Sequence, residues 1–355
     1  MRKTILFILP DLNMGGAERI VTTLINNIDK EKYRPILLLM RKEGYYLELL
    51  DKTTEIIDIK TKRIRNSFFP ILRTLRQLKP NIVFGGWGEV SAYLALVIPL
   101  FPKTKFIARE TNIVSQHVTR PEIKFFYRFY NNFHKIIAQS DDMKEDLVRN
   151  LKINESKIVK INNPVDFDSI EKKETAIISL PFSANSKNVL AIGNLSHRKG
   201  FDNLLRVFEF LKTENIHLYL IGDGQDREKL LAQKENLQLD KVHFLGTVTN
   251  PYPYLKNCDL FVLSSRYEGF PNVLLEAGAC GTFSLSNNCK GGINEIIQPN
   301  INGKIADIEN HSHFAEEIKT ALSEIHDKNA IKNSIKSRFS KETIISQYEQ
   351  VFDNC

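Results

Sequence analysis

The sequence lacks the features of a membrane-spanning or disulfide-bonded protein. It contains no run of about 18 or more uncharged apolar residues, so we expect no transmembrane helix. Residues 1–9 resemble a signal peptide only briefly, because Pro10 and Asp11 end a short apolar stretch without a small-residue cleavage site. None of the four cysteines belongs to a CxxC pair, which favours free thiols in a reducing compartment. We therefore expect a cytoplasmic protein.

Metal-binding motifs are also missing from the sequence. It has no HExxH pair, no DxD motif and no EF-hand loop. We therefore expect a protein that needs neither a metal ion nor a cofactor.

Negative charge is in deficit. The chain has 49 Lys and Arg against 42 Asp and Glu, which gives a net charge of +7. Such a balance suits an anionic partner: nucleic acid, a membrane surface or a diphosphate-bearing substrate. Two stretches, residues 60–70 and 124–135, mix cations with aromatics, which suits an anionic bilayer or stacked nucleic acid. Buried aromatic helices with solvated charges are the alternative. We favour the membrane surface and expect no nucleic acid.

The order of strand and helix signals predicts two domains. A chain of 355 residues is long for one domain. Alternating strand and helix patterns run through residues 1–165 and restart over residues 186–335, with a polar interdomain linker between them. This predicts the α/β class, with two doubly wound Rossmann-like domains that face a cleft. Ligands would bind at the carboxyl ends of the strands.

One stretch, residues 266–281 (RYEGFPNVLLEAGACG), holds two carboxylates separated by seven residues. An apolar strand pattern precedes it, and a helix pattern starts at Asn272 and ends before Gly281. Eight residues at about 100° each would bring Glu268 and Glu276 to a similar azimuth, where both could face one ligand. The helix N-terminus beside them suits a phosphate group.

Two further segments indicate an anionic ligand. Arg198 and Lys199 lie in GNLSHRKGFD, directly after a predicted strand, where a guanidinium can bind two phosphate oxygens and an ammonium adds a point charge. Gly16, in the loop MGGA after the first strand, would allow close approach of the backbone to a ligand. The alternatives are two solvated charges and an ordinary strand-to-helix turn.

These motifs resemble those of a known family. EGFPNVLLE is similar to the E-x7-E motif of retaining glycosyltransferases with the GT-B fold, family 4 (glycosyl transferases group 1). The R-K-G segment and the first glycine-rich loop are also similar. The resemblance implies transfer of a sugar, with retention, from a nucleotide diphosphate sugar to an acceptor hydroxyl. It favours a UDP-sugar donor, a lipid-linked or surface-polysaccharide precursor as acceptor, and a peripheral position on the inner face of the membrane.

The resemblance also implies residue roles. Arg198 and Lys199 would hold the diphosphate and stabilise its departure, and Glu276 would bind the ribose. The sugar would be positioned by Glu268, as a catalytic residue, and by the segment Phe270, Pro271 and Asn272. Gly16 would contact the donor.

The first domain departs from the family pattern. Arg109, Glu110 and Asn112 occupy a loop where many members have a histidine, and we expect them to position the acceptor or the sugar. The resemblance also predicts that the last helix, about residues 340–355, packs back on the first domain. Two other interpretations stay open: a GT-B enzyme without transferase activity, such as a nucleotide-sugar epimerase, and a non-catalytic nucleotide-sugar-binding protein.

Overall fold

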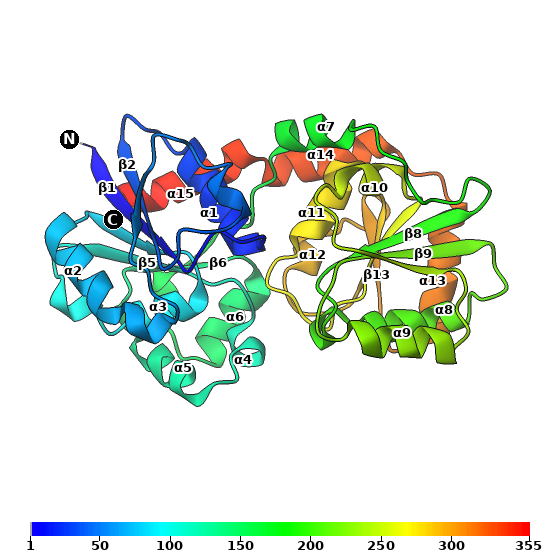
Figure 1. The fold of residues 1–355 in the computed structure, drawn as a ribbon, viewed down its shortest axis with the longest axis horizontal. Coiled ribbons are helices and arrows are strands. Elements are labelled where there is room, and N and C mark those ends of the chain that lie inside the picture. The colour runs from blue at the N-terminus through cyan, green and yellow to red at the C-terminus, as the bar shows by residue number, and fades with distance from the viewer. Residues whose placement is uncertain (1) are drawn as a thin grey trace. The chain divides into compact units, whose positions relative to one another are not determined.

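The computed structural model describes residues 2–355 as two compact units. Unit 1 comprises Met1–Pro164 and Lys341–Cys355, and unit 2 comprises Val165–Ser340. Each unit is built on one parallel sheet with helices on both of its faces (Figure 1). The predicted α/β class, with two doubly wound sheets, is confirmed.

The sheet of unit 1 has seven strands in the order β3-β2-β1-β4-β5-β6-β7. Their bounds are β1 Lys3–Leu9, β2 Tyr33–Leu39, β3 Glu55–Asp58, β4 Ile82–Gly85, β5 Lys105–Arg109, β6 Lys135–Ala138 and β7 Ile158–Lys160. From β1 the chain adds β2 and β3 on one side and then crosses to β4 on the other. The order therefore reverses between β1 and β4, the place where open α/β sheets bind ligands.

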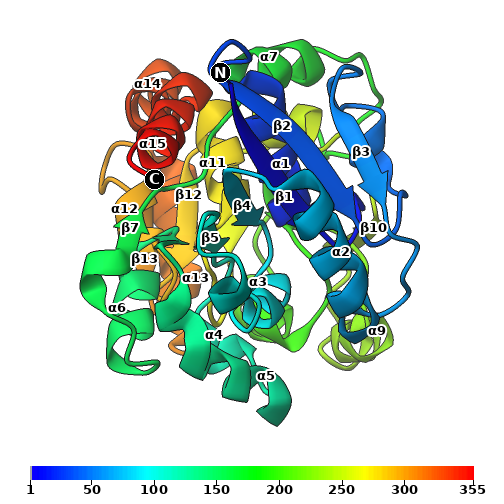
Figure 2. The same ribbon diagram turned by 90° about the vertical axis from the view of Figure 1, so that its left-hand side faces the viewer.

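The helices of unit 1 cover both faces of this sheet (Figure 2). They are α1 Gly16–Asn27, α2 Phe68–Leu78, α3 Gly88–Leu94, α4 Val114–His117, α5 Pro121–Phe126, α6 Asp141–Arg149 and α15 Lys341–Asp353, with 3-10 turns η1 Tyr45–Leu47, η2 Ile64–Ser67, η3 Ile98–Leu100, η4 Tyr127–Asn132 and η5 Glu155–Lys157. Along β1, Phe7 packs with α1 and α15, whereas Leu6 and Ile8 pack with the layer of α2, α3 and α5. Alternate side chains of one strand thus fill two separate cores.

Helix α15 belongs to unit 1 although it ends the chain. The Phe352 ring lies 6.0 Å from Phe84 and 6.4 Å from Phe7, both in central strands. Lys3 Nζ donates to the carbonyl of Phe352 at 3.0 Å, and Tyr33 Oη donates to the carbonyl of Glu349 at 3.2 Å. The last helix is therefore part of one core of unit 1.

Unit 2 has six parallel strands in the order β10-β9-β8-β11-β12-β13. They are β8 Lys187–Ile192, β9 Ile216–Ile221, β10 Val242–Gly246, β11 Leu260–Leu263, β12 Ser284–Asn287 and β13 Gly303–Ala306. The helices are α7 Phe167–Glu174, α8 Phe201–Glu209, α9 Arg227–Asn236, α10 Tyr252–Asn257, α11 Asn272–Ala279, α12 Ile293–Ile296, α13 His311–Ser323 and α14 Lys328–Phe339, with the 3-10 turn η6 His197–Lys199. The order reverses between β8 and β11, so their carboxyl ends mark the expected ligand site of this unit.

The segment 165–187, treated above as a linker, contains helix α7 and lies in unit 2. Asp166 caps the helix by accepting from the Ser169 backbone amide at 3.1 Å. Phe167 and Ile170 are buried against unit 2. Two apolar side chains on one helical face are enough to dock α7, and the polar composition of the segment conceals them.

Candidate active site

Two loops meet at the switch point of the unit 2 sheet. One carries η6 after β8, and the other, residues 264–271, follows β11. Arg266 N donates to the carbonyl of Arg198 at 2.8 Å, and Ser264 Oγ donates to the carbonyl of Lys199 at 2.8 Å. Gly200 ends η6 with φ +64, and a Cβ there would lie 2.1 Å from the carbonyl oxygen of Ser264. Only glycine allows this approach of the loops without strain.

The meeting of these loops assembles a cluster of charged side chains. Arg198 Nη1 lies 2.7 Å from Glu268 Oε2, and Lys199 Nζ lies 2.6 Å from Glu268 Oε1. Ser265 Oγ donates to the same Oε1 at 2.7 Å. The Glu268 side chain is 5% exposed, whereas that of Arg198 is 27% exposed. Two cations against one carboxylate leave a net positive charge, with the Arg198 guanidinium open to solvent.

The carboxyl of Glu268 is ionised in this cluster. Burial raises its pKa, but the charges of Lys199 and Arg198, together with hydrogen bonds from Lys199 and Ser265, outweigh burial and leave the pKa below its usual value. A charged carboxylate holds both cations in place.

The neighbouring residues fix the cluster. The Arg266 guanidinium binds both oxygens of Asp202 at 2.8 Å each and donates to the carbonyl of His197 at 2.7 Å. Glu268 N donates to the carbonyl of Lys290 at 2.9 Å. Gly291 has φ +125, and a Cβ there would lie 2.3 Å from the carbonyl oxygen of Glu268. The arrangement is therefore held by backbone contacts as well as by charge.

Helix α11 begins beside this cluster. Pro271 is its N-cap and half-buried Asn272 its first residue, while Phe270 is buried with its ring 5.7 Å from Phe339. Glu276 lies on α11, half-buried, and accepts from Tyr252 Oη at 3.5 Å. Helical spacing applies only from Asn272 onward, so it does not relate Glu276 to Glu268. The two carboxylates of the motif have different partners.

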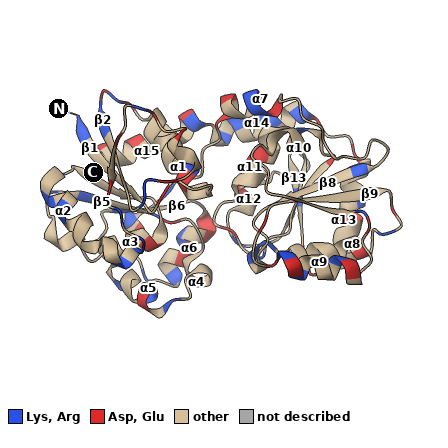
Figure 3. Ribbon diagram, viewed as in Figure 1, with Lys and Arg blue, Asp and Glu red and all other residues tan. Residues whose placement is uncertain are grey.

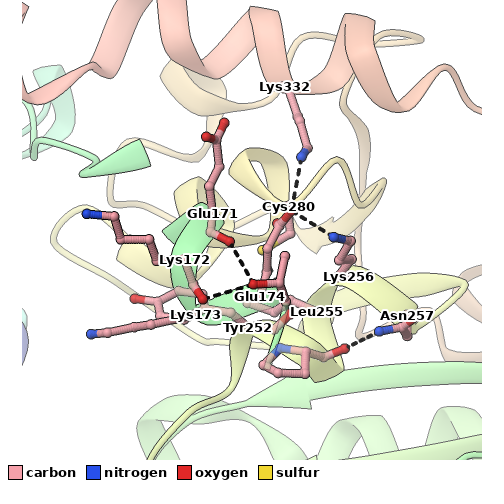
Figure 4. A network of polar contacts seen from close by, with 12 residues as sticks. Glu171, Lys172, Lys173, Glu174, Tyr252, Leu255, Lys256, Asn257, Cys280 and Lys332 are labelled. Carbon is pink, nitrogen blue, oxygen red and sulfur yellow. Dashed lines mark hydrogen bonds and ion pairs between the residues drawn. The ribbon is translucent and has the colours of Figure 1, made fainter. Parts of the chain in front are cut away.

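A second buried carboxylate, Glu174, connects α7 to α10 and α14 (Figure 4). Lys256 Nζ and Lys332 Nζ approach Glu174 Oε1 at 3.0 and 3.4 Å. The Glu174 side chain is 5% exposed, and its Oε2 has no hydrogen-bond partner within residues 2–355. Lys173, the preceding residue, lies 5.9 Å from the ring of Tyr252, the partner of Glu276. The network therefore connects α7 to α10, whose Tyr252 contacts Glu276 of the candidate site.

Gly16 is the exposed first residue of α1, at the switch point of the unit 1 sheet. Gly15 is the N-cap, and a Cβ there would lie 2.1 Å from an oxygen of Glu18. Burial raises the pKa of the Glu18 carboxyl above its usual value, and the nearby charge of Asp11 adds to this effect. The glycine loop therefore fits tightly over an acidic side chain of α1.

Arg109 ends β5 inside unit 1 and is 1% exposed. Its Nε donates to Tyr348 Oη of α15 at 3.1 Å, and its Nη2 donates to Asn163 Oδ1 at 2.8 Å. Its Nη1 has no hydrogen-bond partner among the described residues. Asn112 is half-buried, and its Nδ2 lies 3.4 Å from Thr111 Oγ1. Arg109 therefore links β5 to the last helix.

Glu110, directly after β5, is 2% exposed. Tyr130 Oη donates to its Oε1 at 2.5 Å and Tyr127 Oη to its Oε2 at 3.2 Å. Burial raises the pKa of the carboxyl to about 7, although both phenolic hydrogen bonds lower it. Both tyrosines come from residues 124–135, where we expected a membrane surface. In this segment the alternative interpretation, a buried aromatic helix, is correct for Tyr127, Tyr130 and Phe133, because all three are buried in the core.

Ser265, Tyr252 and the two tyrosines beside Glu110 were not found from the sequence. The tyrosines carry no local signal, because their partners lie 17 to 24 positions away in the chain. Ser265 lies three positions before its partner Glu268 but belongs to no recognised motif. Within residues 2–355, no group of three His, Cys, Asp or Glu side chains is placed to hold a metal ion, and no helix is long and apolar enough to cross a membrane.

Two Rossmann-like units with a cationic cluster at the switch point of the second define a GT-B protein. Residues 172–338 match the family Glycosyl transferases group 1, and residues 14–169 match Glycosyltransferase Family 4. The chain belongs to the group 1 glycosyltransferases and is an enzyme of the hexosyltransferase type.

Curated relatives agree with this assignment. An N-acetylgalactosamine-N,N'-diacetylbacillosaminyl-diphospho-undecaprenol 4-alpha-N-acetylgalactosaminyltransferase of Campylobacter jejuni is 28% identical, and the match covers 95% of each chain. The amylovoran biosynthesis glycosyltransferase AmsD of Erwinia amylovora is 23% identical over 91% of this chain and 90% of its own.

Solved structures share the fold. A glycosyltransferase of Rickettsia africae superimposes with a TM-score of 0.82 at 20% identity, covering 99% of this chain and 98% of its own. Anabaena HepE, in complex with UDP and glucose, gives a TM-score of 0.82 at 18% identity and covers 100% of both chains.

Proposed function

We propose that this enzyme transfers a sugar, with retention, from a UDP-sugar to a hydroxyl group of a lipid-linked saccharide. The observation that carries the proposal is the cluster of Arg198, Lys199 and Glu268 at the carboxyl ends of β8 and β11. The name of one curated relative supports the proposed acceptor, and the ligand of one solved structure supports the proposed donor. The Campylobacter jejuni relative is named for a diphospho-undecaprenol substrate, and Anabaena HepE was crystallised with UDP.

The net positive charge of the cluster would bind the donor diphosphate. Arg198 would bind phosphate oxygens through the part of its guanidinium that Glu268 leaves exposed. As the bond between the sugar and the diphosphate breaks, negative charge grows on the leaving phosphate. Arg198 and Lys199, already held in place, would stabilise the phosphate more strongly in the transition state, where its charge is larger, than in the ground state. Such preferential stabilisation of the transition state is the condition for catalysis.

Other residues would orient the donor. We assign Glu276 to the ribose hydroxyls and the segment Phe270, Pro271 and Asn272, at the start of α11, to the sugar. Glu268 would position the sugar and also hold the two cations, because its carboxylate already contacts both of them. Gly16 would allow close approach of the backbone to the donor.

Retention would follow from attack on the face that the leaving group vacates. The acceptor oxygen forms its bond to the anomeric carbon as the bond to the diphosphate breaks, and the acceptor proton passes to the leaving phosphate. This scheme requires no protein nucleophile, and we propose that it requires no metal ion, because two side-chain cations stabilise the diphosphate. For the acceptor we propose Arg109, Glu110 and Asn112; Arg109 Nη1 is a buried donor with no hydrogen-bond partner among the described residues.

The test compares Arg198→Ala with Arg206→Ala, a control on the exposed face of α8 in the same unit. Loss of one preorganised donor of this kind typically lowers kcat by about 100- to 1,000-fold. We expect that loss in Arg198→Ala, with weakened UDP binding by calorimetry and little change in Tm. Arg206→Ala should behave as wild type, and EDTA should leave turnover unchanged. Wild-type turnover in Arg198→Ala would refute the assignment.

A further inference from the structure

Residues 59–88 of unit 1 contain no Asp or Glu. The segment holds η2, α2 and β4 and includes seven cations, as many as the net charge of +7 of the whole chain. They are Lys60, Lys62, Arg63, Arg65, Arg73, Arg76 and Lys79. The positive excess of the protein is thus concentrated on one part of its surface.

Helix α2 presents part of this charge on a single face. Phe69, Arg73 and Arg76 are exposed and follow one another at helical spacing, i, i+4 and i+7. The Phe69 side chain is 78% exposed, while Ile71 and Leu72 on the other face are buried. Figure 3 shows α2 with blue Lys and Arg positions and no red ones. An exposed aromatic therefore begins a stripe of arginines.

These cations are not neutralised within the protein. None of the seven forms an ion pair with any residue in the described part of the chain, 2–355, whereas neighbouring Arg34 and Arg41 pair with Glu55 and Asp11. A concentration of unpaired like charges repels itself and attracts an anionic partner. An exposed aromatic among cations adds affinity for a lipid interface, where the ring enters the headgroup region and the arginine stems bury their apolar part.

We infer that the outer face of α2 (Phe69, Arg73 and Arg76) and the cations of η2 and its N-terminal flank form a docking surface for anionic lipid headgroups. The second basic and aromatic stretch fits this role less well. Its Tyr127 and Tyr130 are buried around Glu110. The inference rests on the proposed function only in that a lipid-linked acceptor would require contact with a membrane; the surface itself is argued from its charge and exposure.

The experiment measures binding to vesicles without any substrate. Vesicles of equal parts phosphatidylcholine and phosphatidylglycerol are compared with pure phosphatidylcholine vesicles by co-sedimentation. Each arginine near an anionic surface is worth about 1 kcal/mol, so Arg73→Gln with Arg76→Gln should weaken partitioning by about 30-fold. Phe69→Ser should weaken it further, and added salt should reduce wild-type binding.

The matched control is Lys124→Gln with Arg128→Gln, two exposed cations of the other stretch, which should bind vesicles as wild type does. Circular dichroism of each variant checks that it is folded. Turnover with a water-soluble acceptor should be unchanged in the α2 variant, which carries Arg73→Gln and Arg76→Gln. Failure of the transferase assay would therefore count against the proposed function, and failure of the vesicle assay against the docking surface. Wild-type vesicle binding by the α2 variant would overturn the inference. So would a wild-type protein that binds single-stranded RNA but no vesicles.

Discussion

Replacing Glu110 with Gln should change how the stability of unit 1 depends on pH. The carboxyl has a folded-state pKa of about 7 against an ordinary value of 4.5. Because burial raises this pKa, the contribution of the group to stability is complete below pH 4.5 and is lost as the pH rises through 7. At about 1.4 kcal/mol per pKa unit, wild-type unit 1 should lose about 2.5 kcal/mol between pH 5 and pH 8 from this group alone.

The two tyrosines beside Glu110 should keep their protons over this range. Burial and the nearby Glu110 charge raise the pKa values of Tyr127 and Tyr130 well above 10. A Gln side chain is uncharged and can accept from one phenol while it donates to the other. The variant should therefore gain about 2.5 kcal/mol relative to wild type from pH 5 to pH 8, whatever its absolute stability.

The assay is urea denaturation followed by tryptophan fluorescence at both pH values. Trp87, the single tryptophan of the chain, lies in unit 1 at the N-cap of α3, so its signal reports this unit. The control is Glu122→Gln, an exposed carboxyl on α5 that should follow wild type at both pH values. Parallel free energies of unfolding for Glu110→Gln and wild type across this range would refute the reasoning.

Two further substitutions test the construction of unit 2 through its thermal unfolding. Gly200→Ala should lower stability by more than about 2 kcal/mol, because the new Cβ combines φ +64 with a 2.1 Å approach to Ser264. Gly246→Ala is the control, since it has φ +71 but no atom within 4 Å; equal losses would show that the loop contact is unimportant. Glu174→Ala should cost about 1–2 kcal/mol, less than for a fully buried ion pair, because Lys256 and Lys332 reach solvent. Lys256→Ala should cost less than Glu174→Ala, because Lys332 still pairs with the carboxylate; the reverse order would contradict this account.

Most elements of the fold could be predicted from local patterns. In α2 the buried positions Ile71, Leu72 and Leu75 recur at helical spacing, which is a local signal for a helix. Ser140, followed by two acidic residues, is a local N-cap signal for α6, and its side chain accepts from Met143 N at 3.1 Å. The short strands β7 and β13 and helix α7 were not predicted. Three or four residues of strand, or one helix with two apolar side chains, give too weak a period to be separated from a loop.

The candidate site could be predicted from the sequence only in part. Arg198, Lys199 and Glu268 were selected as ligand-binding groups, but their contact with one another was not anticipated. Arg198 and Glu268 are separated by 70 positions, and they meet because β8 and β11 are neighbours in the sheet. Glu276 was expected to face one ligand together with Glu268; its contact with Tyr252 Oη of α10 was not anticipated.

The sequence by itself determined the alternation of strands and helices, the two-unit organisation and the residues that could bind a diphosphate. These features depend on spacing and residue type, which are local properties of the chain. The tertiary structure decided which charges are paired. Arg109 is joined to Tyr348 across 239 positions, and Glu110 is enclosed by two tyrosines of a neighbouring helix. It also decided that the cations of α2 face outward unpaired, because burial and charge pairing depend on which distant elements pack together.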